Sequence, residues 1–175
     1  MKYRNPIIRS SFYHNDLGRT IYDTVMELKP SKVIEFGTLD GYSACCIGQA
    51  LHELGRGHLF SYDLWDDYDF NHGELSKTQY NLNYYGVQKY VTLLHGDFFY
   101  WDYEPADLYL IDISNNGDII KYACEKIKGG VIMFEGGTEE RDNIEWMKTY
   151  NKTPIIGSVP FKVINPLFPA LSVCI

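Results

Sequence analysis

Two features are missing from this chain of 175 residues, and each excludes a class of protein. No uninterrupted apolar run reaches the roughly 18 residues that would suggest a membrane-spanning helix. Positive charge is not in excess, because 16 Lys and Arg residues stand against 23 Asp and Glu residues and give a formal net charge of −7. Since nonspecific binding to a phosphate backbone needs clustered Lys and Arg, nucleic acid is not an expected partner.

The signals of secretion and of a zinc site are also missing. The segment 1–6 is basic, but no apolar segment follows it, so no signal peptide is expected. The chain has no Cys-x-x-Cys motif, and no His-Cys spacing supports a zinc site. We therefore expect a cytoplasmic protein that does not span a membrane and whose four cysteines are reduced: Cys45, Cys46, Cys124 and Cys174.

What is present is a repeated alternation of strand and helix patterns. The expected strands are 33–36, 58–62, 91–95, 107–111, 131–134, 155–159 and 170–175, and the expected helices are 15–28, 42–54, 74–85, 117–127 and 139–150. Such alternation gives a parallel sheet with helices on both faces. The last two strands have no helix between them, which predicts an antiparallel pair at the edge of the sheet.

The most informative segment is 33–44, which reads as a buried strand, a glycine turn and the start of a helix. Gly37 and Gly41 have no Cβ, so the backbone can turn sharply and a ligand can approach closely. The helix that opens at Gly41 and includes Ser43 offers free N–H groups and a positive dipole end to a carboxylate. Glu35, which precedes the turn, can accept hydrogen bonds from a cationic amine. Together the two sites suit an amino-acid zwitterion.

The motif Glu35-Phe36-Gly37-Thr38-Leu39-Asp40-Gly41-Tyr42-Ser43 resembles the first motif of class I S-adenosylmethionine-dependent methyltransferases. It is most similar to the version in the catechol O-methyltransferase-like branch, and the resemblance extends over about 25–175. It implies an α/β, Rossmann-like doubly wound sheet of seven strands between two helix layers, in the order 3-2-1-4-5-7-6 with the last strand antiparallel. It also implies a single domain over 1–175, in which 1–30 is an N-terminal segment that could form a substrate lid.

Two other interpretations of the same segment stay open. A nicotinamide-binding loop would need Gly-x-Gly-x-x-Gly, and Glu35 stands where the first of those glycines would be. A strand-to-helix turn that uses glycines and binds nothing is the second interpretation.

Acidic residues follow or end five consecutive expected strands. Because the carboxyl ends of parallel strands meet at one edge of a doubly wound sheet, these acids are expected on one rim, where ligands of such sheets bind. One or two acids there would be ordinary caps or turn residues. The whole set indicates a functional site: Glu35, Asp63, Asp97, Asp112 and Glu135.

The resemblance implies roles for residues along this rim. In that family the strand-end acid and the glycines surround the methionine part of the cofactor, and the serine of the motif contacts its carboxylate. Asp63 corresponds to the acid that binds the cofactor ribose, and Asp97 to the one beside the adenine amine, where Phe98 is a candidate for stacking. The expected residues for S-adenosylmethionine are therefore Glu35, Gly37, Gly41, Ser43, Asp63, Asp97 and Phe98.

Asp112 is the expected catalytic residue, because in the resembling family this acid lies beside the methyl donor and faces the acceptor. In the catechol-type enzymes it also binds magnesium, together with an Asp-Asn pair after the next strand. This chain has Glu135-Gly136-Gly137 there, so we do not favour a metal, although magnesium accepts carboxylates such as Glu135. If the acceptor must lose a proton, His14 and His72 are candidate bases and otherwise plain loop residues.

The expected function is methyl transfer from S-adenosylmethionine to a small-molecule acceptor, at oxygen. The alternative is a module of the same fold that binds the cofactor or a partner and has lost catalysis. A nicotinamide-dependent oxidoreductase is a third hypothesis, against which the glycine loop argues. The apolar, proline-bounded segment 161–169 has three interpretations: a pocket wall, a lid or the contact of a homodimer.

Overall fold

Seven strands form one sheet in the order β3-β2-β1-β4-β5-β7-β6 in the computed structural model, which describes residues 2–68 and 72–175. The strands are β1 (Lys32–Phe36), β2 (His58–Asp63), β3 (Val91–His95), β4 (Leu108–Ile111), β5 (Val131–Glu135), β6 (Phe161–Asn165) and β7 (Leu171–Cys174). The first five run parallel, and β7 is antiparallel to both β5 and β6. This confirms the fold and strand order expected from the sequence.

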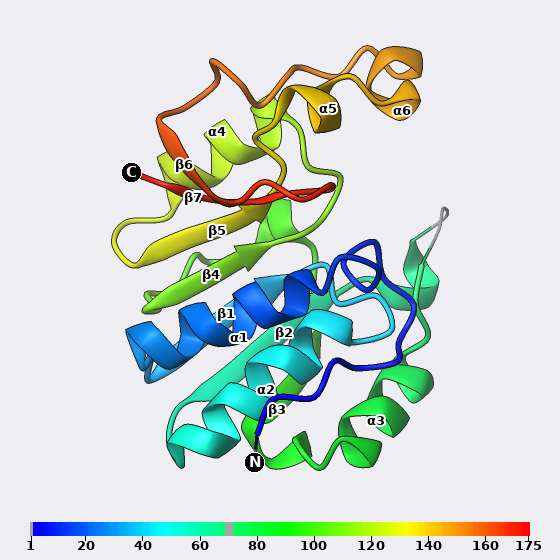
Figure 1. Ribbon diagram of the computed structural model, residues 1–175, viewed down its shortest axis with the longest axis vertical. Coiled ribbons are helices and arrows are strands. Elements are labelled where there is room, and N and C mark those ends of the chain that lie inside the picture. Colours follow the sequence, from blue (N-terminus) through cyan, green and yellow to red (C-terminus); the bar gives the residue numbers. More distant parts are fainter. Residues whose placement is uncertain (1, 69–71) are drawn as a thin grey trace.

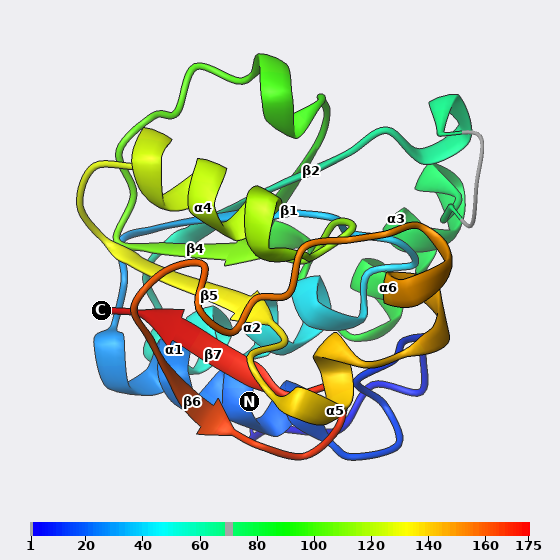
Figure 2. The same cartoon turned by 90° about the horizontal axis from the view of Figure 1, so that it is seen from above.

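Helices cover both faces of the sheet (Figures 1 and 2). They are α1 (Leu17–Leu28), α2 (Tyr42–Leu54), α3 (Leu75–Tyr84), α4 (Gly117–Lys126), α5 (Glu139–Asp142) and α6 (Glu145–Thr149), with 3-10 turns at η1 (Trp65–Asp67), η2 (Gln88–Tyr90) and η3 (Phe98–Tyr100). Helices α1 and α2 lie on one face and α4 on the other, as Figure 2 shows. Within residues 2–68 and 72–175, no helix is long and apolar enough to cross a membrane.

Alternation along β4 divides the core in two. Leu108 and Leu110 belong to the cluster under α1 and α2, while Tyr109 and Ile111 belong to the cluster under α4. This is the two-residue period of a strand that is buried on both faces, as a central parallel strand requires. The fixed faces leave the strand ends as the place where polar groups can gather.

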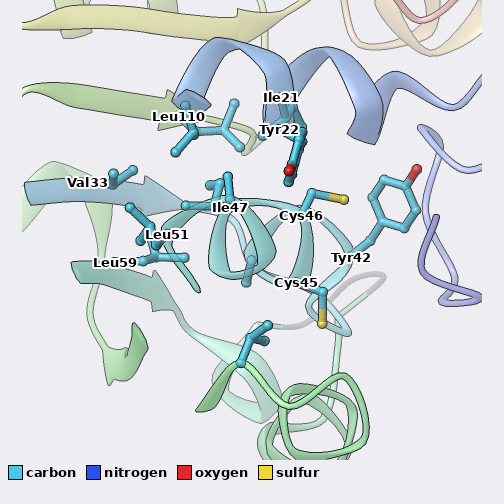
Figure 3. Close-up of a cluster of buried hydrophobic side chains, with 14 of the residues drawn as sticks. Ile21, Tyr22, Val33, Tyr42, Cys45, Cys46, Ile47, Leu51, Leu59 and Leu110 are labelled. Carbon is cyan, nitrogen blue, oxygen red and sulfur yellow. The ribbon is translucent and has the colours of Figure 1, made fainter. Parts of the chain in front are cut away.

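Helix α2 is the most deeply buried helix, and every residue from 42 to 51 is buried. Figure 3 shows Cys45, Cys46, Ile47 and Leu51 on this helix among side chains of α1 and of the sheet. All four cysteines of the chain are free thiols, and Cys45 and Cys46 are buried. Burial raises the pKa of both buried thiols, so they pack as neutral apolar groups.

The prediction of a strand at 155–159 is wrong, because the sixth strand is Phe161–Asn165. Residues 155–158 instead form a turn, in which the backbone N–H of Ser158 donates to the carbonyl oxygen of Ile155 over 3.0 Å and Gly157 has a φ of 86°. Residues 155–159 have the apolar and β-branched composition of a strand. The left-handed backbone of Gly157 nevertheless forms a turn in place of an extended strand. The segment 161–169 is thus largely an edge strand of the sheet.

The predicted helix 139–150 is interrupted. It forms two short helices, α5 and α6, separated by Asn143 and by Ile144, whose backbone is extended. The carboxylate of Asp142 accepts hydrogen bonds from the backbone N–H groups of Ile155 and Ile156, at 3.0 and 2.9 Å. These bonds stabilise the end of α5 and tie it to the turn that leads into β6.

Candidate functional site

A cavity of about 870 Å³ opens at the carboxyl ends of the parallel strands. Its lining comes from the loops after β1, β2, β3 and β4, from the segment before α1, and from α5, α6 and the loop that follows. The loops after the strands, the segment before α1 and the α5–α6 segment gather at the same end of the molecule in Figure 1. A cavity of this size at this edge of a doubly wound sheet is the usual place for a cofactor or substrate.

The loop between β1 and α2 depends on its glycines. Gly37 has a φ of 91°, and a Cβ atom built there would lie 2.0 Å from the backbone oxygen of Asp112. Gly41 has a φ of 89°, and its Cβ would lie 3.0 Å from the Cγ2 atom of Thr78. Side chains at Gly37 would therefore strain the turn and collide with the neighbouring loop. Gly37 lines the cavity, whereas Gly41 packs against α3.

Asp63, the last residue of β2, holds this loop. Its Oδ2 atom accepts hydrogen bonds from the backbone N–H groups of Thr38 and Leu39, at 2.7 and 2.8 Å. Its Oδ1 atom accepts one from the N–H of Trp65 at 2.8 Å. A carboxylate has about four lone-pair positions, so one acceptor position remains at Asp63, which lines the cavity.

Glu35 lies beneath the loop rather than in the wall of the cavity. Its side chain is fully buried, and its Oε2 atom accepts a hydrogen bond from the Oγ atom of Ser61 at 2.5 Å. The Oγ atom of Ser61 is also 2.6 Å from the Oγ1 atom of Thr38, which connects Glu35 to the glycine loop. Burial raises the pKa of the Glu35 carboxyl to about 7, and the neighbouring Ser43 and Ser61 oppose the shift.

The start of α2 presents an open helix N-terminus to the cavity. Ser43 lies in the first turn of this 13-residue helix and lines the cavity. No side chain of the described residues caps the helix. Its free backbone N–H groups and dipole favour a carboxylate.

Asp97 and the phenylalanines that follow it border the same cavity after β3. The Oδ1 atom of Asp97 accepts from the N–H of Phe99 at 2.9 Å and so caps the short η3 turn. Phe98 is buried, and its ring packs edge-on against that of Phe36 with centroids 5.1 Å apart. Phe99 also lines the cavity and is 48% exposed. Phe99 was missed from the sequence, where only Phe98 was considered.

Asp112 follows β4 on the other side of the cavity. Its backbone N–H donates to the carbonyl oxygen of Phe36 at 2.8 Å, which fixes it beside the glycine loop. Burial raises the pKa of its carboxyl well above the usual value; Glu135 and Glu35 add to the shift, and Arg141 opposes it. Asp112 thus lies where several acids converge, as their positions at strand ends predict.

Glu135 is paired with an arginine. The Nε atom of Arg141 donates to the Oε1 atom of Glu135 at 2.6 Å, and the two side chains are only 7% and 11% exposed. The Oγ atom of Ser11 donates to the other oxygen of Glu135 at 3.2 Å. The carboxylate considered as a magnesium ligand is therefore bound to a guanidinium. Across residues 2–68 and 72–175, no group of three or more His, Cys, Asp or Glu side chains could hold a metal ion.

The segment before α1 crosses the mouth of the cavity. The Nε atom of Arg9 donates to Asp40 at 3.1 Å, and its Nη2 atom donates to the backbone oxygen of His72 at 2.8 Å. His72 lines the cavity, whereas His14 is exposed and does not. Arg9 was missed from the sequence, because an arginine in an N-terminal segment carries no local signal for a partner about 30 residues away.

The sequence also did not reveal the wall built by α5, α6 and the following loop. Arg141, Trp146, Tyr150 and Lys152 line the cavity from this side. The one available signal was Arg141, a basic residue among acids soon after the fifth strand. Its partner could not be assigned, because the sequence does not show how the turn at Gly136-Gly137 folds the helix back onto Glu135.

A family model described as "Methyltransferase domain" matches residues 34–134, which include the glycine loop, Asp63 and most of β5. The chain belongs to this family. By family and fold it is a class I S-adenosylmethionine-dependent methyltransferase, as the resemblance of the first motif implied.

Solved structures show the same fold at low sequence identity. An O-methyltransferase from Bacillus cereus in complex with SAH is 17% identical, with a TM-score of 0.66 over 98% of this chain and 84% of that one. The SAH-bound methyltransferase PaMTH1 from Podospora anserina is 15% identical, with a TM-score of 0.61 over 94% and 78%. Cofactor-bound Rv0187 from MTB is 19% identical, with a TM-score of 0.64 over 97% and 81%. Among curated proteins, no sequence matched.

Proposed function

We propose that this methyltransferase binds S-adenosylmethionine in the cavity at the carboxyl ends of the strands and transfers its methyl group to an oxygen of a small molecule. The observation that carries the proposal is the arrangement of Asp63, Ser43 and Asp112 around one cavity, with the Gly37 turn between them. The family and the fold support the cofactor, and the similarity to an O-methyltransferase supports the choice of oxygen.

The residues on the β1–β3 side fit the parts of this cofactor. The remaining lone pair of Asp63 can accept a ribose hydroxyl, and the open N-terminus of α2 at Ser43 can bind the carboxylate. Asp97 can accept from the adenine amine, with Phe98 and Phe99 beside the ring. Glu35 lies beneath the loop and supports it. From this position its carboxylate is proposed to attract the amine of the cofactor.

The chemistry demands alignment more than reactive side chains. Bound S-adenosylmethionine supplies a methyl group that its sulfonium makes electrophilic. The protein must hold the acceptor oxygen in line with that methyl group and keep water out. Asp112 is proposed to position the acceptor, because it lies in the cavity wall between the glycine loop and the α5–α6 side.

Calorimetric titration with S-adenosylmethionine, followed by transfer of a labelled methyl group to a panel of phenols, carboxylic acids and amines, tests the proposal. We expect one-to-one binding and label on oxygen compounds. Binding without transfer to any acceptor would indicate the non-catalytic module instead, and a folded protein that binds no S-adenosylmethionine would refute the assignment. A cytoplasmic location and a homodimer stay predictions.

A further inference from the structure

We infer that Arg141 binds the acceptor oxygen in place of a divalent cation, and that the acceptor is an aromatic compound that presents this oxygen as an anion. The inference rests on the proposed function and names its class of substrate. It is carried by a buried guanidinium with one unused arm, by the aromatic wall beside it and by the charges around it.

Arg141 has a donor to spare inside the cavity wall. Its Nε atom is bound to Glu135 at 2.6 Å, and its Nη2 atom is 3.5 Å from the backbone oxygen of Asn115. Its Nη1 atom is buried and has no hydrogen-bond partner among residues 2–68 and 72–175. A buried donor without a partner is destabilising, so this arm calls for an acceptor atom from a ligand.

The wall beside Arg141 suits a flat, negatively charged molecule. Two cations lie near the ring of Trp146. The Cζ atom of Arg141 is 6.0 Å from the ring centroid, and the Nζ atom of Lys152 is 5.4 Å from it. The ring of Tyr150 lies beside it, with centroids 6.1 Å apart. All four side chains line the cavity. An aromatic ring can pack against Trp146 while its ionised oxygen approaches the two cations.

The charged and titratable groups near this arm are the cations Arg141 and Lys152 and the acids Glu135 and Asp112. Burial raises the pKa of the Asp112 carboxyl well above its usual value, which favours its neutral form and lowers its repulsion of an incoming anion. Glu135 already has Arg141 as its counter-ion, and Ser11 donates to the remaining oxygen of Glu135. Arg9 is bound to Asp40 at a different part of the cavity. Arg141 and Lys152 are thus the cationic side chains of the α5–α6 wall that reach the cavity.

An ionised acceptor also explains how the transfer can proceed without a base. A lone pair of the anionic oxygen forms the bond to the methyl carbon while the carbon–sulfur bond breaks, and that electron pair stays on sulfur. The products are a methyl ether or a methyl ester and neutral S-adenosylhomocysteine, and no proton has to be removed. The guanidinium selects the anion before the reaction and fixes its orientation.

The test measures binding to the protein saturated with S-adenosylhomocysteine, so that no turnover is needed. Benzoate, 4-nitrophenolate and neutral benzyl alcohol are titrated by calorimetry and by tryptophan fluorescence. We expect at least one of the two anions to bind ten or more times more tightly than benzyl alcohol. Tight binding of benzoate would indicate a carboxylic acceptor, and tight binding of 4-nitrophenolate a phenolic one.

Variants assign this preference to the guanidinium. Arg141→Gln should abolish the preference for anions, whereas Arg141→Lys should keep part of it. Lys148→Gln is the matched control, because Lys148 is exposed on α6 and does not line the cavity; it should change nothing. If Arg141→Gln does not fold, the double variant Glu135→Gln/Arg141→Gln removes both partners of the ion pair and does not leave Glu135 as an unpaired buried charge.

Three results would overturn the inference. The first is an anion preference that survives in the folded Arg141→Gln or double variant, and the second is the lack of an anion preference in the wild type. The third is an anion preference that a chelator removes, because a bound metal would then hold the oxygen. Failure of the wild type to bind S-adenosylhomocysteine would refute the proposed function itself, which keeps the two failures distinguishable.

Discussion

The two sides of the cavity satisfy their acidic groups in different ways. On the β1–β3 side, Asp63 accepts three backbone N–H groups, and Asp40 is paired with Arg9 and Lys77. On the β4–β5 side, Asp112 stays among other acids, and Glu135 is neutralised by Arg141, which keeps an unused donor. The first side offers a ligand the remaining acceptor position of Asp63 and the free N–H groups of α2, while the second offers the unused donor of Arg141.

The helices that support the two sides of the cavity also differ. The glycine loop is held by α3, where the Oγ1 atom of Thr78 donates to the backbone oxygen of Leu39 and the Nδ2 atom of Asn81 donates to that of Asp40, both at 2.8 Å. The opposite wall consists of two helices of four and five residues. Rigid packing suits a part of the cavity that always binds one cofactor. Short surface elements are where acceptor specificity can change without loss of the fold.

The largest effect is expected at the turn itself. Gly37→Val should abolish binding of S-adenosylmethionine and destabilise the protein, because the new side chain meets the Asp112 backbone and the φ of 91° disfavours it. Gly129→Val is the matched control: its φ is 87°, but nothing lies within 4 Å of its Cβ position. Calorimetry and thermal unfolding should show a loss of about 1–3 kcal/mol in the control, with cofactor binding intact. Normal binding by Gly37→Val would reduce the glycine to an ordinary turn residue.

Asp112→Asn should lower turnover about 100-fold, as the removal of one group that stabilises the reacting centre typically does. Cofactor affinity should change much less, because the proposed cofactor contacts lie on the β1–β3 side. Rates with the methyl acceptor, once it is identified, and calorimetry with the cofactor separate the two effects. Chelator should leave the wild-type rate unchanged. Complete loss with chelator and recovery with magnesium would contradict the metal-free account.

Asp63→Asn should weaken cofactor binding at least tenfold, because the loss of a charge-assisted acceptor costs about 1.5–3 kcal/mol. Asp107→Asn provides the control at the opposite end of the sheet. The Oδ2 atom of Asp107 likewise accepts from the backbone N–H groups of Ser31 and Lys32, at 2.7 and 3.0 Å. That variant should lose stability and keep its affinity. Equal affinities of the two variants would mean that Asp63 only supports the loop.

Glu35→Gln should have the smallest effect on cofactor binding, because Glu35 lies outside the cavity wall. The substitution should instead change how the free energy of unfolding depends on pH. With a pKa of about 7 in the folded state against 4.5 for the ordinary carboxyl, the folded protein keeps a proton that the unfolded chain loses. Stability due to this group is therefore present below about pH 4.5 and falls as the pH rises to 7.

Denaturant unfolding of wild type and Glu35→Gln from about pH 4 to about pH 8 isolates this contribution. The difference between the two proteins cancels the other titrating groups. We expect the amide variant to become relatively more stable as the pH rises, by about 1.4 kcal/mol for each pKa unit of the shift. A difference that is independent of pH would show that Glu35 is ionised in its buried position.

The fold and the cofactor side could be predicted because their signals are local. The glycines at Gly37 and Gly41, the β-branched strand before them and the acid at Asp63 lie at fixed spacings within one strand–helix–strand unit. In the structure the two glycines have left-handed backbone conformations, and Asp63 binds the loop between them, as that spacing indicates. The structure adds that Glu35 and Gly41 act from behind the cavity wall.

The acceptor side could not be predicted because its contacts depend on how loops fold back. Arg141 reaches Glu135 across the turn at Gly136-Gly137, and Asp142 binds the turn at Ile155, and no periodicity in the sequence indicates either contact. The strand expected at 155–159 was wrong for a local reason, because the turn at Gly157 outweighed a strand-like composition. Ser11, from the segment before α1, completes the corner from 124 residues away along the chain.

The central claim is that this cavity is a site for S-adenosylmethionine and not for a dinucleotide. Calorimetric titration of the wild-type protein with S-adenosylmethionine, and separately with NADH, tests it most directly. The account predicts saturable one-to-one binding of S-adenosylmethionine and no binding of NADH. Binding of NADH by a folded protein that ignores S-adenosylmethionine would contradict it.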